Sequence, residues 1–227
     1  MAAPVFLIGT GTSVGKTHFA ERLLRGLTAE NIRACGYKPV ESGVADPSDP
    51  STDAARIARA SPFHVKPALV RFTFARPVSA HLAAREAGRE VDLGTIRGEI
   101  LRGAALAEVL LVELPGGAFS PLTDSVLAAE FTRTVPGARA LLVASDRLGV
   151  LHDVCATVRA CASLGRPIDG IVLSAPATPD ESTGSNAAEL VRFTSVPILA
   201  SLERGAANAP LAKEDPVRAI ARGLART

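Results

Sequence analysis

The sequence predicts an α/β fold in which helices pack on both faces of a mostly parallel β-sheet. Short apolar runs alternate along the chain with longer segments whose apolar residues recur at helical spacing, which is typical of strands joined by crossover helices. Hydrophobic residues make up 47% of the 227 residues but aromatic residues only 4%. The core must therefore be built from aliphatic side chains, as in a buried sheet flanked by Ala-rich helices.

The expected strands are short apolar runs. Val5–Ile8 comes first and ends at Gly9, and Val109–Glu113 has the clearest strand pattern in the chain. Leu69–Phe74 is predicted to be a strand or an extended segment. The other expected strands are Ile32–Tyr37, Ala140–Ala144, Ile168–Ser174 and Val196–Leu199.

The expected helices separate these runs. Lys16–Leu27 has apolar residues at helical spacing, and Thr52–Ala60 begins where Ser51 or Thr52 can act as N-cap. The other expected helices are Ile96–Ala107, Leu151–Leu164, Ser185–Phe193 and Pro216–Ala225. The polar segments Ser42–Ser51 and Pro176–Gly184 are predicted to be loops. No change in composition marks a boundary, so we expect one domain over residues 1–227.

The charge balance excludes some classes of partner. Twenty-five basic and 23 acidic residues give a formal net charge of +2, without the basic stripe that a nucleic-acid-binding surface needs. No apolar stretch approaches the ~20 residues that span a bilayer, and the N-terminus lacks the basic region of a signal peptide. Three cysteines without metal-binding spacing indicate reduced thiols. We expect a soluble cytoplasmic protein that binds neither nucleic acid nor membrane.

A glycine-rich segment joins the first expected strand to the first expected helix. It reads Gly9-Thr10-Gly11-Thr12-Ser13-Val14-Gly15-Lys16-Thr17, with Thr10 where the common pattern has its first glycine. Backbone N–H groups of such a loop surround phosphate oxygens, and the helix start adds partial positive charge. Lys16 is placed to reach the β- and γ-phosphates, and the Thr17 hydroxyl to bind Mg²⁺. This pattern predicts a P-loop enzyme or switch that binds a nucleoside triphosphate.

A second lysine follows the second expected strand, in Tyr37-Lys38-Pro39-Val40-Glu41-Ser42-Gly43. Because Pro39 interrupts strand pairing, Lys38 leaves the sheet at its carboxyl end, where parallel α/β sheets bind ligands. Only four of the 25 basic residues are lysines, and a compact ammonium can stabilise a transferring phosphoryl group. We therefore favour a catalytic role for Lys38 over that of a solvated loop lysine.

Two acidic residues lie where a metal site needs them. Asp53 opens a helix after the polar loop, and Glu113 ends a strand before Leu114-Pro115-Gly116-Gly117, a Walker-B-like position. Mg²⁺ takes oxygen ligands from carboxylates, hydroxyls and phosphates. The alternatives are a helix-dipole charge for Asp53 and a hydrated strand-end carboxylate for Glu113. We predict that Thr17, Asp53 and Glu113 bind the metal, with Glu113 also beside the nucleotide.

Taken together, these motifs resemble the dethiobiotin synthetase family. The shared order is the loop ending in Gly15-Lys16-Thr17, then Tyr-Lys-Pro-Val-x-Ser-Gly, then an Asp that opens a helix. The segments Thr73–His81, Glu113–Gly117 and Ser120–Asp124, and the Leu148-Gly149 turn, also match family patterns. The resemblance covers roughly residues 5–175.

The resemblance implies an ATP-dependent ligase of biotin biosynthesis with a P-loop NTPase-like three-layer fold. Its implied substrates are 7,8-diaminononanoate, CO₂ and a nucleoside triphosphate, with Mg²⁺ as cofactor. One amine forms a carbamate, the γ-phosphoryl group moves to the carbamate oxygen, and the second amine displaces phosphate to close a ureido ring. The family roles imply Lys16, Lys38 and Thr12 as catalytic residues.

Implied substrate contacts are Thr12, Lys38, Ser42, Gly116 and Gly117, with the carboxylate end of the substrate at Gly149, Val150 and Leu151. Those last three are expected to come from a partner subunit, which implies a homodimer. Several positions depart from the family pattern: Ser13, Leu114-Pro115, Val150–Asp153, Ser174–Pro176 and the region around Leu202. These departures leave the phosphate motifs intact. They affect the expected preference for the nucleotide base and the expected binding site of the substrate carboxylate.

Other P-loop classes remain as alternatives. A partitioning or cell-division switch has a similar loop but carries a second lysine near its start, where this chain has Gly11. Another P-loop ligase or kinase, a regulatory P-loop domain and an inactive paralogue are the remaining alternatives.

Overall fold

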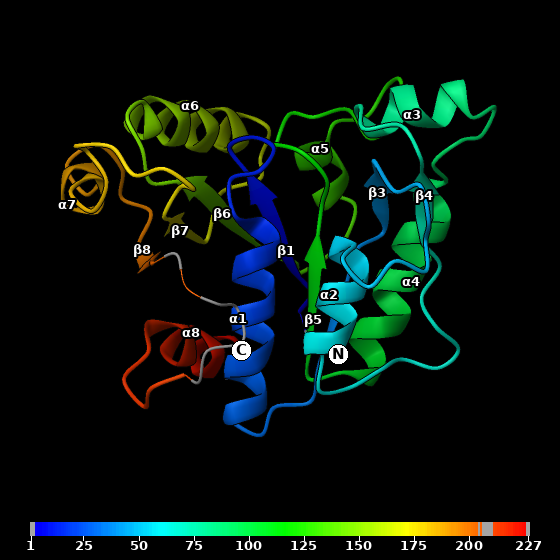
Figure 1. Cartoon of the computed structure of the whole chain (residues 1–227), viewed down its shortest axis with the longest axis horizontal. Helices are drawn as coiled ribbons and strands as arrows, with labels where there is room; N and C mark the ends of the chain where they lie inside the picture. The colour runs from blue at the N-terminus through cyan, green and yellow to red at the C-terminus, as the bar shows by residue number, and fades with distance from the viewer. Residues whose placement is uncertain (1–2, 204, 206–210, 226–227) are drawn as a thin grey trace.

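The computed structural model describes residues 3–203, 205 and 211–225, and it confirms the α/β class (Figure 1). Within these residues the central sheet has six strands in the order β2-β5-β1-β6-β7-β8, and every pairing is parallel. The strands are β1 (Val5–Gly9), β2 (Ala34–Tyr37), β5 (Val109–Glu113), β6 (Arg139–Ser145), β7 (Gly170–Ser174) and β8 (Ile198–Leu202).

Helices cover both faces of this sheet. Alternate residues of β1 point to opposite faces, so Val5 and Leu7 belong to one buried cluster while Phe6 and Ile8 belong to the other. The first face carries α1 (Lys16–Ala29), α2 (Asp53–Ala60) and α8 (Pro216–Ala225). The second carries α4 (Leu93–Leu106), α5 (Ala128–Thr132), α6 (Val150–Ser163) and α7 (Asn186–Leu190).

A small second sheet lies beside the first. Its strands β3 (Val40–Ser42) and β4 (Phe72–Phe74) are parallel, and α3 (Ala80–Glu86) packs against them. β2 ends at Tyr37, as expected from Pro39, but the chain then enters β3 instead of going directly into a loop. The strand expected at Leu69–Phe74 is shorter in the structure, because only its last three residues pair with β3.

Other differences concern bounds and short helices. α4 begins at Leu93 instead of Ile96, and β8 spans Ile198–Leu202 where Val196–Leu199 was expected. The helices α3 and α5 were not expected, because seven and five residues are too few to show a helical period. The expected helix Ser185–Phe193 is reduced to the five residues of α7. All three cysteines are free thiols, as expected. No helix in the described ranges combines the length and apolarity that a membrane crossing requires.

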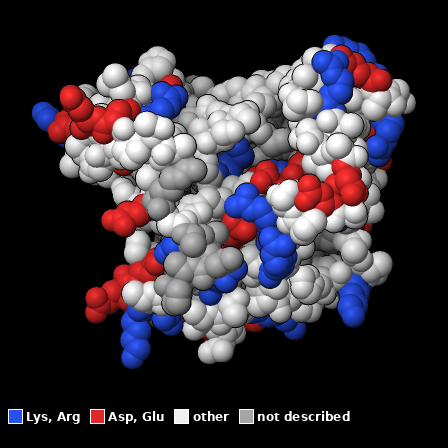
Figure 2. Space-filling model, viewed as in Figure 1, with Lys and Arg blue, Asp and Glu red and all other residues white. Residues whose placement is uncertain are grey.

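The strand order decides what meets at the carboxyl edge of the sheet. β5 lies between β1 and β2, and the register places Glu113 opposite Leu7 and Val112 opposite Tyr37. The loop after β1, Glu113 and Lys38 therefore leave neighbouring strands at one edge. On the face shown in Figure 2, basic and acidic side chains are intermixed, in keeping with the near-balanced composition.

Candidate nucleotide-binding and catalytic site

The loop between β1 and α1 has the close packing of a phosphate-binding turn. Gly15 has φ of 98°, and a Cβ atom there would lie 2.3 Å from Ser174 Oγ at the end of β7. Only glycine fits that position, because both the backbone angle and the contact exclude a side chain. Val14 is buried, whereas Thr12 and Ser13 are exposed at the outside of the turn. The amides at the start of α1 are thus presented at the carboxyl edge of the sheet.

Lys16 reaches back over this loop. Its Nζ donates hydrogen bonds to the carbonyl oxygens of Gly11 at 3.1 Å and Gly116 at 2.6 Å. Burial lowers the pKa of Lys16 to about 8, with Glu113 acting in the opposite direction. A phosphate oxygen placed inside the loop would meet an ammonium already oriented by two carbonyl groups.

Lys38 lies between the two acidic residues that are predicted to bind the metal. Its Nζ is 2.9 Å from Asp53 Oδ2 and 2.5 Å from Glu113 Oε1, and the same Glu113 oxygen accepts a hydrogen bond from Thr17 Oγ1 at 2.9 Å. Burial opposes the charged form of Lys38, but attraction to Glu113 and Asp53 outweighs it and raises the pKa of Lys38. The structure thus brings Thr17, Lys38, Asp53 and Glu113 into direct contact.

Thr17, Asp53 and Glu113 carry the oxygen atoms that could hold a divalent cation. Glu113 is 1% exposed, and its second oxygen Oε2 is buried with no hydrogen-bond partner. No group of three or more His, Cys, Asp or Glu side chains in the described part of the chain could hold a metal by itself. The protein can therefore supply two carboxylates and a hydroxyl, and the remaining ligands would be phosphate oxygens and water, as is usual for Mg²⁺.

Three residues missed by the sequence-based reasoning secure Asp53. Glu41 accepts hydrogen bonds from the backbone N–H groups of Asp53 at 2.7 Å and Ala54 at 3.0 Å. Arg56 donates two hydrogen bonds to the buried Glu21 on α1 and lies 3.6 Å from Asp53 Oδ1. The sequence does indicate the contact between Asp53 and Arg56, because residues three apart on a helix are neighbours. Nothing in the sequence pairs Glu41 or Glu21 with this helix.

Two adjoining cavities lie over these residues. The first, of about 350 Å³, is lined by the phosphate loop, Lys38, Glu41, Asp53, Arg56 and Glu113. The second, of about 310 Å³, extends toward Pro77–Ala80 and Ser120–Pro121. The predicted contacts Thr12, Ser42 and Gly116 border both cavities. Gly117 is buried behind the loop, where a Cβ atom would lie 3.2 Å from the backbone of Gly11.

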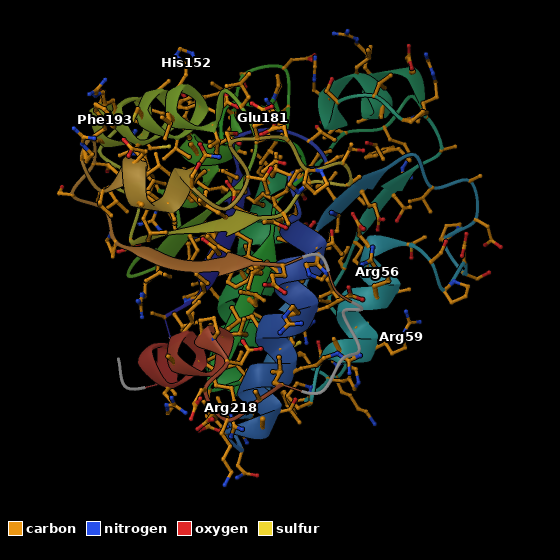
Figure 3. The ribbon with its side chains drawn as sticks, turned by 60° about the vertical axis from the view of Figure 1, so that its left-hand side comes forward. Arg56, Arg59, His152, Glu181, Phe193 and Arg218 are labelled. Atoms are coloured by element: carbon orange, nitrogen blue, oxygen red, sulfur yellow. The ribbon has the colours of Figure 1, made fainter. Side chains whose placement is uncertain are left out.

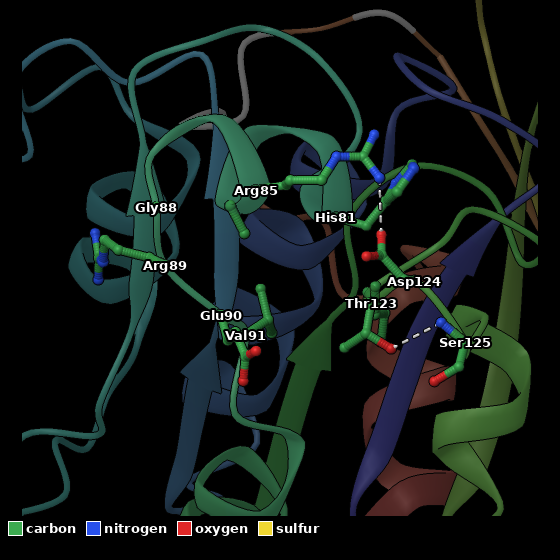
Figure 4. Close-up of a pocket in the computed structure, with 11 residues that line it drawn as sticks. His81, Arg85, Gly88, Arg89, Glu90, Val91, Thr123, Asp124 and Ser125 are labelled. Carbon is green, nitrogen blue, oxygen red and sulfur yellow. Dashed lines mark hydrogen bonds and ion pairs between the residues drawn. The ribbon is translucent and has the colours of Figure 1, made fainter.

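A third cavity, of about 560 Å³, lies between α3 and the segment 122–125 (Figure 4). Arg85 and Asp124 face each other across it at 3.3 Å, and His81 lies beside them. The segments Thr73–His81 and Ser120–Asp124, which are distant in sequence, are therefore neighbours on one side of the site.

The predicted carboxylate-binding residues lie elsewhere. Gly149 precedes α6 with φ of 95°, Val150 is buried and Leu151 half-buried, and none of the three lines the two adjoining cavities. His152 points outward from α6 (Figure 3), and Leu148 is 76% exposed. This region therefore does not complete the site within one chain.

Known structures define the class of fold. A chain of the MinC:MinD cell division protein complex from Aquifex aeolicus aligns with a TM-score of 0.60 and 12% identity, covering 100% of this chain and 97% of that one. The ParA family ATPase from Chlorobium tepidum TLS aligns with a TM-score of 0.55 and 15% identity, covering 90% and 85%. The fold and the loop geometry together are those of a P-loop nucleotide-binding protein.

Sequence relatives define the family. An AAA domain family model matches residues 4–209. ATP-dependent dethiobiotin synthetases from Anaeromyxobacter dehalogenans (strain 2CP-C) and Rhodopirellula baltica are 38% and 37% identical, covering 84% and 90% of this chain and 85% of each relative. A third, from Salmonella typhi, is 30% identical over 89% of this chain and 90% of its own length. The chain belongs to the dethiobiotin synthetase family.

Proposed function

We propose that this protein is an ATP-dependent dethiobiotin synthetase, which closes a ureido ring on 7,8-diaminononanoate with CO₂. The observation that carries the proposal is the position of Lys38, whose ammonium lies beside the phosphate loop and borders the cavity that continues toward Ser42. This arrangement offers one place for the triphosphate and an adjoining place for a second substrate. Family membership supplies the identity of the reaction.

The triphosphate is proposed to lie in the loop Gly11–Thr17, with Lys16 on the β- and γ-phosphates. Thr17, Asp53 and Glu113 are proposed to hold Mg²⁺, which would neutralise phosphate charge when bound. The unpartnered Glu113 Oε2 supports this assignment, because a buried carboxylate oxygen without a donor is costly unless a ligand satisfies it. The segment Ser174–Pro176 lacks the Asn that often reads the purine base in the family, so we propose a relaxed preference for the nucleotide base.

The chain's own residues account for the chemistry as follows. One amine of the substrate takes up CO₂ as a carbamate near Thr12 and Ser42. Lys38 stabilises negative charge on the carbamate and on the γ-phosphoryl group as that group moves to the carbamate oxygen. The second amine then attacks the activated carbonyl carbon, phosphate leaves, and the ring closes. Because both amines belong to one molecule, holding it in the adjoining cavity makes the last step intramolecular.

The carboxylate end of the substrate is proposed to meet the start of α6 in a partner subunit, at Gly149–Leu151. That placement explains why these residues do not line the cavities of their own chain. A helix start is a suitable anion site, and α6 has 14 residues. The working enzyme would then be a homodimer of single-domain subunits.

Phosphate release tests the proposal. The purified protein is incubated with ATP, Mg²⁺ and bicarbonate, with and without 7,8-diaminononanoate. We expect release to rise at least tenfold with the diamine, and GTP or CTP to support part of this activity. Equal release with and without the diamine would contradict ring closure and favour a P-loop ATPase of another kind.

A further inference from the structure

Asp53 occupies a position that needs external support. It is the first residue of α2, it follows a long polar segment, and its side chain is 35% exposed. The early N–H groups of a helix have no partner within the helix, so its start moves freely unless other groups bind them. If Asp53 is a metal ligand, the position of its carboxylate depends on how firmly the start of α2 is fixed.

Two side chains satisfy the first N–H groups of α2, and they act differently. Thr52 Oγ1 accepts from Ala55 N at 3.2 Å, which is a local cap that stabilises the helix wherever it lies. Glu41 Oε1 and Oε2 accept from Asp53 N at 2.7 Å and from Ala54 N at 3.0 Å. Because Glu41 belongs to β3, these two bonds fix the helix start to the second sheet.

Glu41 also follows Lys38 closely in the chain. Lys38 binds the carboxylate of Asp53, and Glu41 accepts a hydrogen bond from its backbone N–H. The short segment from Lys38 to Glu41 therefore fixes both the side chain and the backbone of Asp53. Glu41 lines the nucleotide cavity, but both of its oxygens are engaged by helix N–H groups. It is therefore not free to act as a base or as a metal ligand.

We propose that Glu41 is a positioning residue that fixes Asp53 for the metal–nucleotide complex. The inference rests on the proposed metal site, in which Asp53 is a ligand. Loss of Glu41 should let the start of α2 move away from Lys38 and Glu113 while leaving the phosphate loop intact. The consequence is weaker binding of the divalent cation in the presence of nucleotide.

The test measures Mn²⁺ affinity by electron paramagnetic resonance with a non-hydrolysable ATP analogue, so it does not depend on ring closure. We expect Glu41→Ala to raise the Mn²⁺ dissociation constant about tenfold, as loss of a group that orients a metal ligand does. Glu41→Gln keeps one acceptor oxygen and should show a smaller rise. Thr52→Ala is the matched control, because it removes a bond to the same helix start without releasing it from β3.

Thermal unfolding of each variant separates positioning from folding. We expect Thr52→Ala to lower Tm at least as much as Glu41→Gln while leaving the Mn²⁺ dissociation constant within twofold of wild type. The proposal is overturned if Glu41→Gln and Glu41→Ala bind Mn²⁺ as wild type does, or if Thr52→Ala weakens Mn²⁺ binding as much as Glu41→Ala. A wild type that binds Mn²⁺ and nucleotide normally but releases no diamine-dependent phosphate would contradict only the ring-closure function.

Discussion

Lys38 Nζ lies 2.5 Å from Glu113 Oε1, and both side chains are almost fully buried, at 5% and 1% exposure. The pair joins the ends of β2 and β5, which are adjacent in the sheet although the two residues are 75 positions apart. A buried ion pair is strongly destabilised when only one partner is removed, because the other charge is left unpaired. The same two residues are thus central to the stability of the site and to its proposed chemistry.

Lys38→Ala should therefore affect both activity and stability. We expect turnover to fall at least ~100-fold, since the group proposed to stabilise developing charge is lost. We expect the free energy of unfolding in urea to fall by about 3 kcal/mol, because Glu113 loses its partner. Lys38→Arg should also lose turnover, because the planar guanidinium does not replace the compact ammonium.

The double variant Lys38→Met/Glu113→Gln separates the two effects. It should recover much of the stability lost in Lys38→Ala, since neither buried charge remains, but none of the activity. Near-normal turnover of Lys38→Ala would remove Lys38 from the catalytic assignment.

Lys16 predicts a pH dependence of stability. Folding lowers the pKa of Lys16 from 10.5 to about 8, mainly because the ammonium is buried. Between these two values the unfolded chain holds a proton that the folded protein has lost, so the free energy of unfolding should rise with pH over that window. The rise should reach about 3 kcal/mol. Urea titrations of wild type and Lys16→Met between pH 7.5 and about 10.5 provide the measurement, and parallel profiles would contradict the prediction.

The ion pair between α1 and α2 gives a third prediction. Arg56 and Arg59 both project from α2 (Figure 3), but only Arg56 binds the buried Glu21. Arg56→Ala should cost about 2 kcal/mol of unfolding free energy, since it removes charged hydrogen bonds from a buried carboxylate. Arg59→Ala is the matched control and should change it by less than about 0.5 kcal/mol. An effect of Arg56→Ala no larger than that of Arg59→Ala would contradict a stabilising contribution from the Glu21 contact.

Glycine at position 117 is required by the approach of two backbones. A Cβ atom there would meet the backbone of Gly11 and Thr10 at 3.2 Å, so Gly117→Ala must displace the phosphate loop by a few tenths of an ångström. We expect about a tenfold loss of ATP affinity in calorimetry, since backbone N–H groups are proposed to provide the phosphate contacts. Gly98→Ala, on α4 with open space around it, should instead stabilise the protein by about 0.5 to 1 kcal/mol. Unchanged ATP affinity in Gly117→Ala would refute the contact argument.

The sequence predicts the long elements and the residues at strand ends well. Apolar periodicity locates Val109–Glu113 and Pro216–Ala225 with the bounds observed in the structure. β4 falls inside the expected segment Leu69–Phe74, but β3 escapes prediction, because it is three residues long and carries polar residues at two of its positions. Local patterns cannot report a pairing that is set by packing between distant segments.

Some residues of the candidate site can be predicted from the sequence and others cannot. Lys38 and Glu113 are predictable because the ends of parallel strands share one edge of a sheet. Glu41 and Glu21 are not, because their partners lie 12 and 35 positions away and depend on how α2 is placed. The sequence thus predicts which groups meet at the edge of the sheet, while the structure is needed to find the residues that hold them in place.

Isotope incorporation distinguishes ring closure from ATP hydrolysis alone. The protein is incubated with 7,8-diaminononanoate, ATP, Mg²⁺ and [¹³C]bicarbonate, and the products are analysed by mass spectrometry and phosphate assay. The proposed function predicts dethiobiotin with the label in its ureido carbon, with one phosphate released per ring formed and product from Lys38→Ala lowered at least ~100-fold. Phosphate release without labelled dethiobiotin would contradict it.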